Sequence, residues 1–113
     1  MSKRNWRLFL EDILESIELI ESYVKGMDAE SFTGDRKTVD AVVRNFEIIG
    51  EAAKSIPSDV KEKYQNVDWS GMTGLRNRIV HEYFGLSLPI IWKIVTDDIP
   101  TLKEEIVRIG KRI

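Results

Sequence analysis

The sequence contains no cysteine and only one histidine, His81. Without cysteine the chain has no disulfide bonds, zinc-thiolate sites or thiol nucleophiles. A histidine-rich metal site cannot be built from one histidine in one chain. The sequence therefore predicts neither a metal site nor a cofactor.

Long apolar runs and a strong excess of either charge are also missing. No uninterrupted apolar run approaches the roughly 20 residues that span a bilayer, and the N-terminal segment MSKRNWRLFLEDI turns acidic before a signal-peptide core forms. With 17 Lys and Arg against 19 Asp and Glu, the formal net charge is −2. Nonspecific coating of nucleic acid needs a clustered basic surface, so any nucleic-acid contact must be local. We expect a cytoplasmic protein without membrane association.

What remains is the composition of a globular protein. Of the 113 residues, 42% are apolar and 32% are charged, a balance that is typical neither of disordered chains nor of membrane proteins. A folded chain of this length buries roughly two-thirds of its extended surface. Because no internal repeat, low-complexity tract or linker is visible, we expect a single domain over residues 1–113.

Apolar residues recur every three or four positions along most of the chain, which is the spacing of one face of a helix. No alternating run bounded by turns indicates a strand. The sequence therefore predicts an all-α fold, a bundle of four to five helices. The expected helices cover residues 6–24, 35–56, 58–64, 70–84 and 87–112, the last with a kink or break at Pro100.

Arg76 is the strongest anomaly in this pattern. On a helical wheel it lies at the centre of an apolar arc, where a charge is costly unless an acid, a phosphate or a second chain pairs with it. His81 lies about 140° further round the helix, one turn beyond Asn77. The apolar arc is formed by Met72, Leu75, Ile79, Val80 and Tyr83.

Two interpretations of Arg76 follow from helix geometry. In the first, it forms a buried ion pair with Glu47 or Glu51, and His81 only bonds to backbone. In the second, both side chains face one cleft and act on a substrate. Arg44 is at helical spacing from its acidic neighbours and is expected to pair with them.

The segment RNRIVHEY, residues 76–83, resembles the Arg-x4-His-x-Tyr signature of HepT-type toxins in the HEPN superfamily. The segment NFEIIGEA, residues 45–52, is similar to a second stretch that is typical of that family. Trp69 and residues 92–102 extend the likeness over nearly the whole chain, with no departure at the signature positions.

The resemblance implies a HEPN fold, a homodimer and a metal-independent ribonuclease that is the toxin of a HEPN/MNT (type VII) toxin-antitoxin system. It assigns Arg76 and His81 as catalytic residues and Asn77 as an auxiliary polar group. It also implies a partner, an MNT-type nucleotidyltransferase antitoxin, which transfers AMP from ATP to Tyr83. Structural pairing is the favoured role of Arg44 and Glu51.

The residue types suit this chemistry independently of the family. Cleaving RNA without a metal requires a base for the 2′-hydroxyl, an acid for the leaving oxygen and a cation for the developing charge. A two-fold dimer would bring two histidines and two arginines to a shared cleft. The alternatives are a noncatalytic helical module that binds a nucleotidyltransferase or a nucleotide, and a purely structural helical protein.

Overall fold

The computed structural model describes residues 5–82 and 87–112, and within these ranges the side chains of 76–82 and 112 are not described. All regular structure in these ranges is helical, so the all-α prediction is confirmed. Four long helices are joined by short ones in a bundle. The elements are α1 Trp6–Val24, α2 Ala29–Thr33, α3 Arg36–Lys54, α4 Ser58–Lys63, α5 Trp69–Glu82, α6 Leu88–Lys93, the π-helical turn η2 Ile94–Asp98, and α7 Ile99–Arg112.

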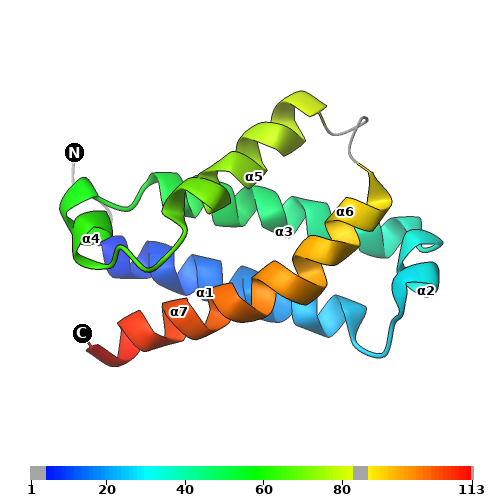
Figure 1. The fold of residues 1–113 in the computed structure, drawn as a ribbon, viewed down its shortest axis with the longest axis horizontal. Coiled ribbons are helices and arrows are strands. Elements are labelled where there is room, and N and C mark those ends of the chain that lie inside the picture. The colour runs from blue at the N-terminus through cyan, green and yellow to red at the C-terminus, as the bar shows by residue number, and fades with distance from the viewer. Residues whose placement is uncertain (1–4, 83–86, 113) are drawn as a thin grey trace.

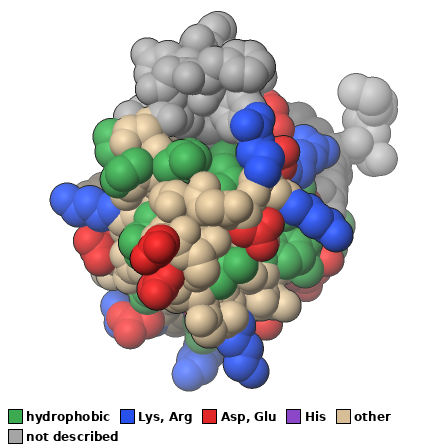
Figure 2. All heavy atoms as spheres, turned by 90° about the vertical axis from the view of Figure 1, so that its right-hand side faces the viewer, with side chains coloured by type: hydrophobic (Ala, Val, Ile, Leu, Met, Phe, Trp, Pro, Cys, Tyr) green, Lys and Arg blue, Asp and Glu red, His purple; other side chains and the backbone are tan. Residues whose placement is uncertain are grey.

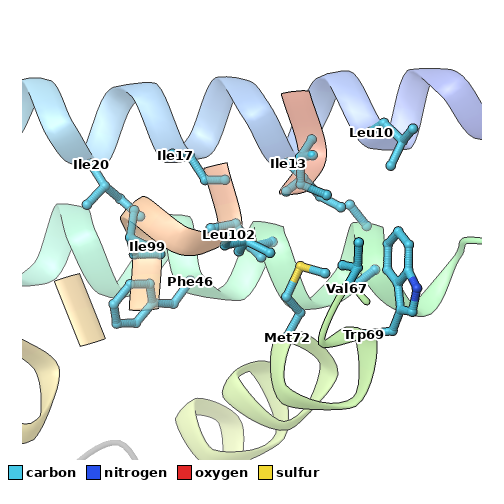
Figure 3. Packing of buried hydrophobic residues seen from close by; sticks show 14 of the residues in the cluster. Leu10, Ile13, Ile17, Ile20, Phe46, Val67, Trp69, Met72, Ile99 and Leu102 are labelled. Atoms are coloured by element: carbon cyan, nitrogen blue, oxygen red, sulfur yellow. The ribbon is translucent and has the colours of Figure 1, made fainter. Parts of the chain in front are cut away.

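Helix α3 is central to the bundle, because it packs extensively against both α1 and α5 (Figure 1). Helix α7 runs along α1, and the short α2 packs against α6, where the rings of Phe32 and Trp92 lie 4.9 Å apart. Side chains from α1, α3, α5 and α7 point into one shared interior (Figure 3). Its most deeply buried members include Ile13, Ile17, Ile20, Phe46, Ile49 and Ile99.

Side-chain caps mark where α1, α2 and α3 begin. The Asn5 side chain accepts a hydrogen bond from the Arg7 backbone N–H, and Asp28 accepts one from Ser31 at 2.8 Å. Asp35 accepts from both the backbone N–H of Thr38 (3.1 Å) and its hydroxyl (2.8 Å). These bonds satisfy backbone donors that have no partner within the helix. The backbone hydrogen bond from Thr38 holds the pKa of Asp35 below its ordinary value of 3.8.

The cap at Asp35 makes stability depend on pH. Since the pKa of Asp35 is lower in the folded chain, ionised Asp35 stabilises the fold above the unfolded value of 3.8, and this contribution is lost as pH falls through the folded pKa. We expect the melting temperature of Asp35→Ala to be lower than that of the wild type at pH 7. The difference between the two melting temperatures should become progressively smaller below about pH 4. Asp35→Asn keeps a capping acceptor but cannot titrate. Thermal unfolding of the three proteins at a series of pH values tests this, and a gap to Asp35→Ala that is constant with pH would contradict it.

The interruption predicted at Pro100 takes the form of a π-helical turn and not of a break. The backbone N–H of Ile99 donates to the carbonyl of Ile94, five residues earlier. Pro100 lacks an N–H and its ring crowds the preceding turn, so the widened turn directly before it relieves the clash. The hydroxyl of Thr96, in this turn, donates to the carbonyl of Trp92 in α6 (3.1 Å). The path from α6 through α7 therefore stays helical.

Within residues 5–82 and 87–112, no helix is both long and apolar enough to cross a membrane.

Candidate functional site

Helix α5 carries the signature residues, and its first turn is capped by Asp68. The Asp68 carboxylate accepts a hydrogen bond from the Gly71 backbone N–H at 2.9 Å. A Cβ at position 71 would overlap that carboxylate, so glycine permits this capping geometry. Helix α5 begins at Trp69, one residue before the predicted start at residue 70. The acidic residue three positions before the glycine is the sequence signal for this cap.

Trp69 and Met72 anchor the beginning of α5 in the core. Both side chains are buried, and the indole N–H of Trp69 donates to the backbone carbonyl of Tyr64 at 3.1 Å. This bond ties α5 to the segment after α4, because Tyr64 directly follows that helix. The site is therefore carried by a helix whose first turns are fixed to the bundle.

The helix continues to Glu82, which confirms that Arg76, Asn77 and His81 belong to a single helix. Arg76 and His81 are about 7.5 Å apart along its axis and about 140° apart around it, while Asn77 and His81 share a face. The side chains of these three residues lie outside the described part, and so does Tyr83. Their roles and contacts remain predictions.

The second family-like stretch lies on α3, where the predicted pairing of Arg44 is confirmed. Its guanidinium contacts the Glu47 carboxylate at 3.2 Å, and the two side chains are 69% and 33% exposed. Such an exposed pair contributes little to stability. Glu51 is exposed as well. Glu47 is thus partly exposed and Glu51 exposed, and the pairing of either with Arg76 stays a prediction.

Arg44, Glu47 and Glu51 line a shallow groove between α3 and α1. It encloses about 370 Å³ and is completed on the α1 side by Phe9 and Asp12. The two glutamates of the second stretch, Glu47 and Glu51, therefore lie in a groove beside α1. Among the described residues, no group of three or more His, Cys, Asp or Glu side chains is arranged to hold a metal ion.

Comparison with known proteins places these features in a family. The model of the family described as "Ribonuclease HepT-like" matches residues 13–109. "Probable ribonuclease HepT" of Thermococcus cleftensis is 43% identical over 109 residues, covering 96% of this chain and 99% of the relative. "Putative RNase MJ1380" of Methanocaldococcus jannaschii is 44% identical over 106 residues, covering 94% and 97% of the two chains. "Putative RNase TTE0752" of Caldanaerobacter subterraneus is 40% identical over 103 residues, covering 91% and 92%.

No solved structure gives a significant match. With the family model spanning α5 and most of the bundle, the resemblance seen in the sequence is confirmed, and the chain belongs to the ribonuclease HepT-like family.

Proposed function

We propose that this chain is a metal-independent ribonuclease, formed as one domain over residues 1–113, in which Arg76 and His81 are the catalytic residues and Asn77 an auxiliary polar group. The observation that carries the proposal is the family match over residues 13–109, which contains the whole of α5 and with it both residues. Relatives that cover nearly the same length are named as ribonucleases.

The chemistry assigns a role to each residue. His81 takes the proton from a ribose 2′-hydroxyl, whose oxygen attacks the adjacent phosphorus and displaces the 5′-oxygen of the next nucleotide. The products are a cyclic phosphate and a 5′-hydroxyl, which receives a proton from the general acid. Arg76 stabilises the negative charge that develops on the phosphorane oxygens. Its planar guanidinium can donate two parallel hydrogen bonds to a phosphate.

A homodimer supplies the second proton-transfer group. One chain has a single histidine, so a base and an acid that are both histidines require two chains around one cleft. The slightly acidic total charge is compatible with phosphate binding if the arginines act locally. We further propose that the protein is the toxin of a HEPN/MNT (type VII) system, held inactive when an MNT-type nucleotidyltransferase transfers AMP to Tyr83.

The test of this function is RNA cleavage by the purified protein in the presence of EDTA. We expect defined single-stranded RNA to be cut at a rate that chelation does not lower, and light scattering to give the mass of a dimer. Cleavage that disappears with EDTA would contradict the metal-independent mechanism. If no RNA is cut but the protein binds a nucleotide or a nucleotidyltransferase, the protein is a noncatalytic binding module and the ribonuclease proposal is wrong.

A further inference from the structure

A groove separates α5 from the path formed by α6, η2 and α7. Within the described residues, α5 packs extensively against α3, whereas its contacts with the other elements are few. In Figure 1, α5 diverges from the α6 to α7 path on the side away from α1. The groove encloses about 570 Å³. It is lined by Asp68, Gly71, Met72, Leu75, Ile90, Lys93, Ile94, Asp98, Ile99, Thr101, Leu102 and Glu105.

The lining consists of two helical stripes that face each other. Residues 68, 72 and 75 follow at three- and four-residue intervals on the α5 side, and residues 90, 94, 98, 102 and 105 do so on the opposite side. Two such stripes form the walls that a third helix packs against, through ridges that fit between their side chains. From residue 90 to residue 105 the wall is about 22 Å long, which matches a helix of about 15 residues.

The described lining of the groove is partly apolar and partly exposed. Half of the lining residues are hydrophobic, and among them Ile90 is 42% exposed. Leu88, two residues earlier, is 36% exposed. Figure 2 looks onto the end of the molecule that includes α6, where hydrophobic side chains gather below the grey residues. Clustered exposed apolar side chains beside a groove are typical of a protein-binding surface.

The charged side chains that line the groove indicate the charge of a partner that could bind there. Among the described lining residues, Asp68, Asp98 and Glu105 contribute three carboxylates, and Lys93 contributes one ammonium group. Acidic side chains repel the phosphates of RNA, so the described lining favours a cationic ligand over RNA. A two-fold contact between identical chains pairs each residue with a different residue of the second copy, and would place two acidic rims in one interface. A cationic partner would instead be attracted by these carboxylates.

We propose that the groove between α5 and the α6 to α7 path is the docking site for a basic amphipathic helix of a partner protein. The apolar stripe of that helix covers Leu75, Ile90 and Ile94, and Lys or Arg side chains on its flanks face Asp68 and Asp98. The site adjoins the helix that carries Arg76 and His81, yet its formation does not depend on RNA cleavage.

The test uses two fluorescent synthetic peptides of about 18 residues, long enough to span the groove as helices. Both have leucines at helical three- and four-residue spacing, and the remaining positions are lysines in one peptide and glutamates in the other. By fluorescence anisotropy we expect the lysine peptide to bind the full chain and the glutamate peptide not to bind. Ile90→Glu should weaken binding at least about tenfold, and Asp98→Lys should weaken it severalfold.

Matched variants outside the groove serve as controls. Leu19→Glu alters an apolar side chain on α1 that is 37% exposed, and Asp97→Lys makes the same charge change on an exposed residue of η2 that does not line the groove. Both should bind like the wild type, and circular dichroism should show all four variants folded.

Three results would overturn the proposal. The first is equal loss of binding in the groove and control variants. The second is direct binding of an RNA oligonucleotide that Ile90→Glu weakens and Leu19→Glu does not. The third is a change from dimer to monomer in Ile90→Glu but not in Leu19→Glu, which would show that a second copy occupies the groove. Because peptide binding is measured without RNA cleavage, this outcome is independent of the ribonuclease test.

Discussion

Replacing His81 with alanine is expected to slow RNA cleavage by on the order of 10² to 10⁴-fold, the usual range for a lost proton-transfer group. Arg76→Ala should cause a loss of comparable size, since it removes the cation that stabilises the charge on the phosphorane. In the proposed mechanism both residues act on the same phosphate, so the double variant should lose less than the product of the single losses. Initial rates on one RNA oligonucleotide, measured in EDTA, provide the comparison.

Arg78→Ala is the matched control, because it removes an arginine from the same helix but outside the signature. Its cleavage rate should stay within a few-fold of the wild type, as expected for a charge that only steers the substrate. All three variants should remain folded, since alanine favours a helix and the anchors of α5 at Asp68, Trp69 and Met72 are untouched. Unaltered cleavage by His81→Ala, or equal losses in Arg76→Ala and Arg78→Ala, would refute the assignment.

Transfer of AMP to Tyr83 is expected to abolish cleavage in the wild type and to leave Tyr83→Phe active. The phenolic oxygen attacks the α-phosphorus of ATP, pyrophosphate leaves and the phenol proton is lost, so a phosphodiester-linked AMP with a negative charge remains. Tyr83 follows Glu82, the last residue of α5, and is seven residues after Arg76. The sequence predicts a helix to residue 84, and in such a helix two turns bring these positions back to the same face. The adduct would then occupy the phosphate site and neutralise the Arg76 cation.

The experiment incubates each protein with an MNT-type nucleotidyltransferase and ATP, followed by mass spectrometry and a cleavage assay. Tyr23→Phe is the control, because Tyr23 is a 39% exposed tyrosine on α1. It should be modified and inactivated like the wild type. Tyr83→Phe should keep its activity and carry no adduct. An adduct that persists in Tyr83→Phe, or a modified wild type that still cuts RNA at full rate, would show that Tyr83 is not the switch.

The helices of this protein could be predicted from the sequence because their determinants are local. Apolar residues every three or four positions define α1 and α3 to within two residues, since a helix brings these positions to one face. The same local spacing predicted that Arg76, Asn77 and His81 share one helix and that Arg44 pairs with a nearby acid. The family resemblance also depended only on residues close together in the chain.

Other features depend on short-range hydrogen bonds that the spacing of apolar residues does not reveal. The beginning of α5 depends on the bond from Trp69 to the Tyr64 carbonyl and on the Asp68 cap, and the irregularity before Pro100 was resolved as a π-helical turn within a continuous path.

The groove beside α5 depends on contacts between distant segments. Residues 68–75 and 90–105 each have an ordinary amphipathic pattern. Neither pattern indicates that a groove separates the two segments in the folded chain. That separation follows from how α3 and α1 position the helices packed on them. By itself the sequence determined which residues share a helix face, because a helix is built from neighbours in the chain. Only the tertiary structure decided which faces meet and which stay open, because side-chain packing joins residues that are far apart in sequence.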